Sequence, residues 1–542
     1  MIVNRSMYPL QTGYSVISRM QEQFSNLQTQ LGTGQKSSTL GGMGRDLPIS
    51  LSTRARLETI EGYSSNIDSV NLRLSFLDKT LTRFDKIEGE ARNAAIQGQY
   101  GTGGINMATL PGLSKARFDE IVTMLNDDVA GRYLFGGSKT DKPPLADTDT
   151  LLYGANGKLG FTDVRDLRAV ADGVNDGDKL GRLKLDGVTG STVTLREDGD
   201  HVFGLKLSNA STTASSSSVV ITPPGAGGSP KSLSVEFIDQ PTPGQSITIG
   251  LTLPDGTETQ MRLTATTFDP AEPGNFTIGT DAAATAANFN RALETTLKAT
   301  VQTELKAAST FAASNDFFSE SGVPKLPAGG PPPTSLEADT AGRAVQWYTG
   351  DTSTNPRNSV SAAVDDSTRV NYGMQANESG FLRLIRSQAA LAISEYPSEA
   401  NVRGKQVHED VRLAAMALPE GAQRDTMLAE YEAAVKADYR LSTGFFDGMA
   451  KRQQSELSES HNSEAGSIEI LTMDIGLAQG TLQSASTRHT DYKGQLANLL
   501  SDVETVSKED VAMQILALQT RLQASYQTTS MVSQLSLVNY LR

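Results

Sequence analysis

Cysteine is absent from the 542 residues of this chain, and histidine occurs only four times, as His201, His408, His461 and His489. Without thiols the chain can form no disulfide and no cysteine-ligated metal centre, and it has no cysteine nucleophile. Four scattered histidines supply little material for a metal site or an acid–base centre. We therefore expect no catalytic residues, no metal site and no cofactor, and a protein that is not an enzyme.

Long apolar runs and an excess of basic residues are also missing. Nowhere do 18 apolar residues follow one another, so no membrane insertion is expected. Pro9 and Gln11 stand where a secretory signal would have its apolar segment, so no cleaved signal is expected. The 48 Lys and Arg against 62 Asp and Glu give a net charge of −14, which argues against nucleic acid as a partner.

Both ends of the chain have apolar residues at alternating intervals of three and four. The first run, 17–31, is followed after Pro48 by a second one from Ile60 to Phe84, and a third, shorter helix is predicted after Pro111 with Phe118 on its apolar face. A mean spacing of 3.5 residues is typical of helices that coil around one another.

The C-terminal third repeats this pattern more regularly. One stripe extends from Ile468 through His489 to Val503 and predicts a helix roughly 50 Å long. A last helix is predicted to begin at Ser507, whose hydroxyl can cap it, with Asp510 three residues later. Its stripe starts apolar and becomes weaker towards the C-terminus.

The middle of the chain, about 150–335, alternates apolar and polar residues with period two, which is typical of strands. Hairpin turns are predicted at Asp198-Gly199 and at Asp255-Gly256, and a polar loop at 211–218. A helix is predicted over 285–305 and a linker over 323–334.

The predicted fold class is therefore α+β, with long N- and C-terminal helices forming a coiled-coil stalk or bundle and a β-rich middle insertion. The expected organisation is two terminal coiled-coil parts, two halves of a helical rod, and an outer insertion of one or two subdomains. The boundaries are 1–50 and 506–542 for the coiled-coil parts, 51–145 and 336–505 for the rod, and 146–335 for the insertion.

Motifs that usually carry chemistry are weak here. The Gly-rich segment 131–140 lacks a lysine directly after its second glycine and follows a helical pattern, so we interpret it as a helix-ending turn rather than a phosphate loop. The GGMG of 41–44 is interpreted as a loop, and His489 as a polar position of the helical stripe. Asp365-Asp366 is expected in a loop or helix cap, and Trp347 as a packing residue.

The terminal helices are the most informative feature, because stripes that are long, terminal and only weakly apolar need neighbours to be stable. We expect the two ends to pair with each other and then with other subunits. The predicted assembly interface consists of Ile17, Met20, Phe24, Leu27, Leu31, Val511, Ile515, Leu518, Leu522, Val532, Leu535 and Leu541.

Over about 1–145 and 365–542 the chain resembles the bacterial flagellin superfamily. The resemblance rests on LQTQLGTGQK (27–36), GRYLFGGSKTDKPPL (131–145), DDSTRVNYGMQANE (365–378) and LQASYQTTSMVSQLSLVNYL (522–541), and it is nearest to the hook-associated proteins between hook and filament. It implies a secreted, extracellular structural subunit of the flagellum, exported through the type III apparatus and required for motility. The implied partners are copies of itself in a helical layer, a neighbouring hook-associated protein, flagellin and an export chaperone.

Two other functions are compatible with the sequence. The ending Leu541-Arg542 is shared with filament flagellins, so a filament subunit is the main alternative. The second alternative is a secreted enzyme or carbohydrate-binding protein whose active part is the β-rich insertion, with the helices as a stalk. The insertion, however, lacks clustered catalytic residues.

Overall fold

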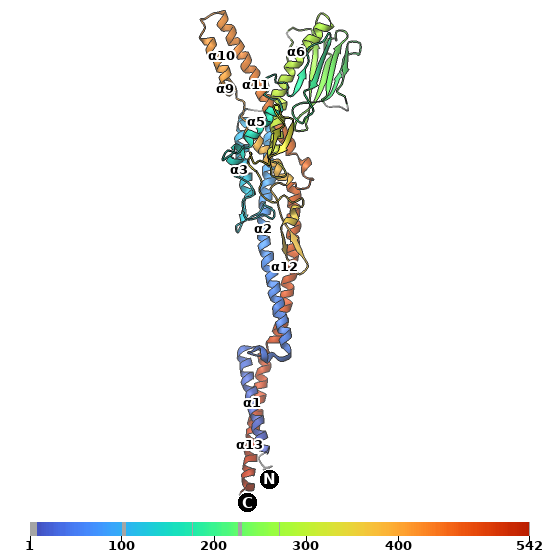
Figure 1. The fold of residues 1–542 in the computed structure, drawn as a ribbon. Helices are drawn as coiled ribbons and strands as arrows, with labels where there is room; N and C mark the ends of the chain where they lie inside the picture. The colour runs from blue at the N-terminus through green and yellow to red at the C-terminus, as the bar shows by residue number, and fades with distance from the viewer. Residues whose placement is uncertain (1–7, 100–103, 176, 226–229, 270, 541–542) are drawn as a thin grey trace. The chain divides into compact units, whose positions relative to one another are not determined.

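The protein has an α+β fold with long helices and several small sheets (Figure 1). The computed structural model describes residues 8–99, 104–175, 177–225, 230–269 and 271–540. The chain divides into two compact units. The terminal unit comprises Met1–Leu72, Ala362–Val370 and Ala478–Arg542, and the central unit comprises Arg73–Ser361 and Asn371–Leu477. The bounds of the five predicted segments stay a prediction.

In the terminal unit, helix α1 (Tyr8–Thr33) lies antiparallel to helix α13 (Lys508–Tyr540), with the start of α1 and the end of α13 at the same end of the pair (Figure 1). The backbone N–H of Asp510 donates to Ser507 Oγ at 3.2 Å, so the predicted cap of the last helix is confirmed. At the other end of the pair, Gln35 and Thr505 form an antiparallel bridge.

Between α1 and the next long helix lies a short 3-10 helix, η1 (Leu40–Asp46), where a loop was predicted. This helix is irregular, because Gly44 inside it has a non-helical φ of 55°. Glycine adopts such a positive φ without steric cost. Helix α2 (Leu47–Gln99) begins directly after it.

The predicted long helices around Ile60–Phe84 and Ile468–Val503 are confirmed as α2 and α12 (Ile468–Glu504). Most stripe positions are buried, as their spacing required. Tyr492 and Leu499 depart from this pattern, with 41% and 43% of their surface exposed.

Helix α3 (Gly104–Leu125) begins before Pro111 and contains it, so the predicted start after this proline is wrong. Phe118, Ile121 and Leu125 are buried on one face as expected. The chain then forms the two-residue strands β1 (Asp128–Val129) and β2 (Arg132–Tyr133). Segment 131–140 thus contains strand β2 and turns on both sides of it, with positive φ at Gly131 and Gly137.

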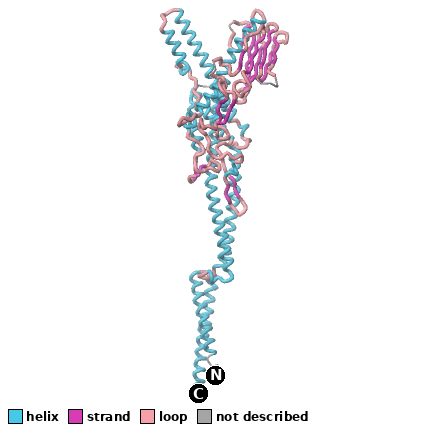
Figure 2. Tube along the Cα trace, viewed as in Figure 1, coloured by secondary structure: helices cyan, strands magenta, loops and turns pink. Residues whose placement is uncertain are grey.

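Two four-stranded sheets form the strand-rich part of the central unit (Figure 2). One has the order β3-β4-β7-β6 and the other β10-β9-β8-β5, in which β10 is parallel to β9 and all other pairs are antiparallel. Their bounds are β3 Leu183–Leu185, β4 Thr192–Glu197, β5 Lys206–Thr212, β6 Val219–Thr222, β7 Ser232–Phe237, β8 Ser246–Thr252, β9 Glu258–Thr266 and β10 Asn275–Thr277. A shared core of buried aliphatic and phenylalanine side chains holds the sheets together.

Of the two predicted hairpins, only the one at Asp255-Gly256 exists. Gly256 has φ 82° and joins β8 to β9, which pair directly. The predicted hairpin at Asp198-Gly199 is wrong, because β4 and β5 belong to different sheets. Instead of closing a turn, Asp198 accepts hydrogen bonds from Arg182 Nε and His201 Nε2, each at 2.5 Å.

The predicted helix over 285–305 is confirmed and continues further. It comprises α6 (Ala282–Thr300), a π-helical turn η2 (Val301–Leu305) and α7 (Lys306–Phe317). The predicted linker over 323–334 is wrong, because β11 (Lys325–Ala328) pairs with β12 (Ser335–Ala338) in a hairpin. The predicted loop 211–218 begins only after Thr212, where β5 ends.

The remaining elements are mainly helical. They are α4 Thr148–Tyr153, α5 Phe161–Ala171, η3 Pro356–Ser359, β13 Ser361–Ala363, β14 Arg369–Asn371, α8 Ser379–Ala392, α9 Glu399–Arg403, α10 Gln406–Met416, α11 Ala422–Glu456 and η4 Glu459–His461. Trp347 is fully buried and donates from Nε1 to the Ser319 carbonyl at 3.0 Å, so its predicted packing role is confirmed.

Candidate assembly surface

Six of the predicted interface residues of the two terminal helices meet within one chain. Ile17, Leu518 and Leu522 form a buried cluster, 6–8% exposed. Partly buried Met20, Phe24 and Leu27 pack against this cluster. The inner stripe therefore holds α1 against α13, as the spacing of three and four residues requires.

The other predicted interface residues differ in burial. Val511 is buried, Leu31 and Ile515 are partly buried, and Val532 is 41% exposed. Leu535 and Leu541 lie outside the residues whose side chains the structure describes. Their predicted role in assembly stays a prediction.

Polar contacts set the register of the α1–α13 pair. Gln21 Nε2 donates to Tyr526 Oη at 2.7 Å, and Ser525 Oγ lies 4.0 Å from Met20 Sδ. A Cβ on Gly13 would lie 3.4 Å from Thr529 Oγ1, so the helices approach closely here. The weakly apolar stripe positions of α13 thus make specific contacts with α1.

The outward face of α13 carries a second stripe that α1 does not cover. Met513, Leu516 and Met531 are 61–63% exposed. Between Met513 and Met531 lie exposed, uncharged residues at alternating intervals of three and four: Ala517, Thr520, Ala524 and Gln527. From Val511 to Tyr540 the helix contains one charged residue, Arg521, and α1 contains two, Arg19 and Glu22. Surface helices usually carry charge on their solvent face.

An ion pair and several hydrogen bonds connect the end of α12 to the start of α2 and to Lys36. Arg54 donates to Glu504 through Nε at 2.8 Å and Nη2 at 2.6 Å, and Ser50 Oγ donates to the same carboxylate. The hydrogen bonds from Arg54 and then from Ser50 lower the pKa of Glu504. Lys36 adds a hydrogen bond from Nζ to the Asp502 carbonyl at 2.9 Å.

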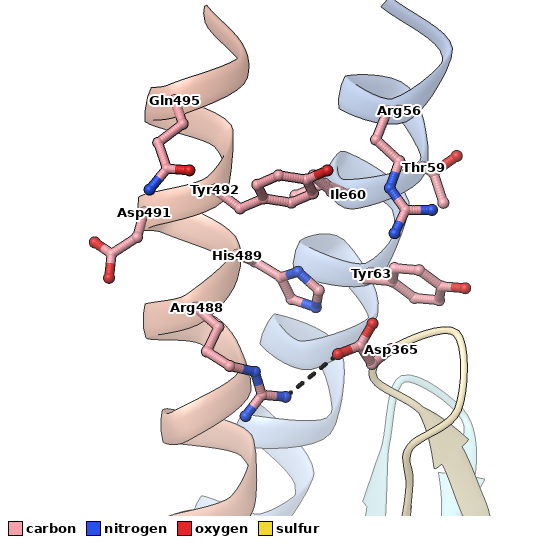
Figure 3. Close-up of a pocket in the computed structure, with 10 residues that line it drawn as sticks. All are labelled: Arg56, Thr59, Ile60, Tyr63, Asp365, Arg488, His489, Asp491, Tyr492 and Gln495. Carbon is pink, nitrogen blue, oxygen red and sulfur yellow. Dashed lines mark hydrogen bonds and ion pairs between the residues drawn. The ribbon is translucent and has the colours of Figure 1, made fainter. Parts of the chain in front are cut away.

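Further along the same unit, a groove of about 400 Å³ opens between α2 and α12 (Figure 3). Its lining side chains are Arg56, Thr59, Ile60, Tyr63, Asp365, Arg488, His489, Asp491, Tyr492 and Gln495. His489 is 5% exposed, stacks on Tyr63, and donates from Nε2 to the Val364 carbonyl at 2.7 Å. His489 is therefore a buried polar position of the helical stripe, as its spacing predicted.

The tip of the β13–β14 hairpin, residues 364–368, links the two helices at this groove. On the α2 side, Asp366 accepts from Tyr63 Oη at 2.9 Å and pairs with Arg56 at 3.0 Å. On the α12 side, Asp365 lies 3.3 Å from Arg488. The hydrogen bonds from Tyr63 and Arg56 lower the pKa of Asp366. The sequence predicted a loop or a helix cap for the two aspartates, and the structure has them in a loop. No pattern in the sequence predicted their partners.

Within the described residues, no group of three or more histidine or acidic side chains is arranged to hold a metal ion. Across the same part of the chain, no helix is both long and apolar enough to cross a membrane. The features that stand out in the terminal unit are thus the uncharged outer stripe and the polar groove, both of which are surfaces.

No protein-family model and no curated protein matches this chain.

Proposed function

We propose that this protein is a non-enzymatic, self-assembling structural subunit of an extracellular helical appendage, and specifically a junction subunit between the hook and the filament of a bacterial flagellum. The role that we propose is that of hook-associated protein 3, which the terminal sequences resemble. The outer stripe of α13, from Met513 to Met531, is the observation that carries the proposal.

An isolated antiparallel pair of helices buries only one stripe of each helix. The described pair runs over Tyr8–Thr33 of α1 and Lys508–Tyr540 of α13, and each helix has a face that its partner does not cover. A second uncharged stripe at the same three-and-four spacing gives a neighbouring helix a surface on which to pack without burying charge. The occupant we propose is the α1–α13 pair of neighbouring copies of this chain, arranged as coiled coils in a helical layer.

The charge distribution supports the same arrangement. The chain as a whole carries −14, yet the paired ends carry almost no charge outside the first turn of α13. Like-charged subunits repel one another, so a stacked core is favoured when the helices that form it are nearly neutral. The rest of the chain keeps the subunit soluble before assembly.

The test separates the outer stripe from the inner one. Met513→Glu combined with Met531→Glu should leave the α1–α13 pair intact, because both side chains are exposed, and should abolish incorporation into flagella. Gln514→Glu is the matched control, since Gln514 is exposed on another face of α13. Normal incorporation of the doubly substituted protein would contradict the proposal.

Deletion of 507–542 is a coarser version of the same test, and it should leave the central unit folded while preventing incorporation. Immunogold labelling then distinguishes the junction from the alternative, a flagellin of the filament. Label at one point of each flagellum supports the junction subunit, and label along the whole length supports the filament subunit.

A further inference from the structure

In the central unit, a second open pocket has a composition opposite to that of the chain as a whole. Its volume is about 700 Å³, and its lining side chains are Arg92, Lys451, Gln454, Ser455, Ser458, Glu459, Ser460 and His461. In a protein of net charge −14, it brings together a guanidinium, an ammonium, an imidazole and three hydroxyls against a single carboxylate.

We propose that this pocket binds a tetrahedral oxyanion, the phosphate or sulfate group of a small ester. Arginine presents a planar fork of donors that matches such oxygens, and lysine adds a point charge. Serine hydroxyls complete the set of donors for an anion with several acceptor oxygens.

Arg92 is the arginine of the pocket, and a ligand can displace its present ion-pair partner, Glu459. Its Nη2 lies 2.9 Å from Glu459 Oε1, while Nη1 donates to the Leu457 carbonyl at 3.4 Å. The Glu459 side chain is 75% exposed, and exposed ion pairs of this kind contribute little free energy. An oxyanion can therefore replace this carboxylate on Arg92 at small cost.

The Lys451 side chain makes no hydrogen bond or ion pair in the part of the chain that the structure describes. Its charge acts on the Asp447 carboxylate, one turn earlier in α11, but Asp447 does not line the pocket, so the ammonium is available to a ligand there. The Nδ1 atom of His461 lies 2.6 Å from Glu464 Oε1, a carboxylate that does not line the pocket. Glu88, the other carboxylate near Arg92, has a pKa raised to about 7 by burial and does not fully neutralise the arginine at neutral pH.

The size of the pocket indicates an ester rather than a bare ion. A phosphate or sulfate ion fills only part of 700 Å³, which leaves room for the group that carries it. Gln454 and the three serines are uncharged hydrogen-bonding groups, so they can bind a polar group such as a sugar.

The proposal is tested by calorimetric titration of the full chain with inorganic phosphate, sulfate and glucose 6-phosphate at low ionic strength. Saturable binding is expected. Lys451→Glu should weaken it at least about tenfold, and Glu459→Gln should strengthen it about threefold, because the competing carboxylate is removed. Lys436→Glu is the matched control, an exposed lysine of the same helix α11, and should leave the affinity unchanged.

Equal weakening by Lys451→Glu and Lys436→Glu would show general charge attraction and overturn the site. Absence of saturable binding in Glu459→Gln to any of the three probes would overturn it as well. Tighter binding of glucose 6-phosphate than of inorganic phosphate supports an ester as the ligand, and equal binding would overturn the ester and leave a site for the free ion.

Discussion

The imidazole of His489 stacks on the phenol ring of Tyr63, with ring centroids 5.7 Å apart and planes inclined by 14°. Tyr63 is on α2 and His489 is on α12, more than 400 residues later in the chain. The same two side chains also hold the hairpin tip, Tyr63 through Asp366 and His489 through the Val364 carbonyl. This contact thus joins three segments of the terminal unit.

His489→Ala should lower the free energy of unfolding of the terminal unit by about 1–3 kcal/mol, because it leaves the Val364 carbonyl without its donor and removes the stacked ring. Urea denaturation followed by circular dichroism measures the change. Arg488→Ala is the control: its side chain is 57% exposed, and we expect a loss below about 0.5 kcal/mol. Similar losses in both variants would contradict the role of the stacked pair.

Leu518→Ala should destabilise the α1–α13 pair by about 2–3 kcal/mol, because this side chain is 8% exposed within the cluster around Ile17. The opening is expected to be local, so hydrogen exchange of the α1 amides is the appropriate measurement. Leu516→Ala, at a position 63% exposed on the same helix, should leave that exchange unchanged. Faster exchange with Leu516→Ala would place Leu516 in the inner stripe.

Glu88 makes the stability of the central unit depend on pH. Burial, and then the charge of Glu469, raise its pKa to about 7, above the ordinary value in the unfolded chain. At pH values between the pKa of Glu88 in the unfolded chain and its pKa in the folded chain, the folded state binds more protons than the unfolded state. The contribution of Glu88 to the free energy of unfolding therefore falls as pH rises. Glu88→Gln should therefore change little at about pH 5 and stabilise the protein by on the order of 1 kcal/mol at about pH 8.

Thermal denaturation of Glu88→Gln at the two pH values checks this prediction. Glu58→Gln, at an exposed carboxylate of the same helix, is the control and should show no such difference. A stabilisation of Glu88→Gln that is equal at both pH values would exclude the titration of Glu88 as its cause.

Arg452 connects helix α11 to the β8–β9 turn through an ion pair with Asp255. Its Nε donates to Asp255 Oδ2 at 2.6 Å, with both side chains less than one-tenth exposed, and Nη1 lies 3.2 Å from Glu304. Arg452→Met leaves the Asp255 carboxylate buried without its arginine and should cost about 3–5 kcal/mol. The double variant Arg452→Met, Asp255→Asn should recover a large part of this loss, as measured by urea denaturation. No recovery would mean that packing of the arginine, rather than the ion pair, stabilises this contact.

Much of the helical architecture could be predicted from the sequence, because spacing alone determines which residues share a helix face. The stripe from Ile468 to Val503 and the cap at Ser507 were predicted correctly for that reason. Hairpins were predicted less reliably from their turn residues. Asp255-Gly256 closes a hairpin, whereas Asp198-Gly199 does not, because Asp198 is held by Arg182 and His201.

Of the candidate surfaces, one could be predicted from the sequence and two could not. The inner stripe of α1 and α13 could be predicted, since heptad spacing is visible in one dimension. The groove at Tyr63 and His489 and the oxyanion pocket at Arg92 and Lys451 could not, because their members come from segments hundreds of residues apart and share no spacing.

The sequence by itself determined where the long terminal helices lie, which of their faces are apolar, and how little charge the two ends carry, because these are local properties of the chain. Only the tertiary structure decided which partners the polar side chains find, such as Asp366 with Tyr63 and the Val364 carbonyl with His489. The physical reason is that these contacts join segments more than a hundred residues apart, and no local spacing predicts them.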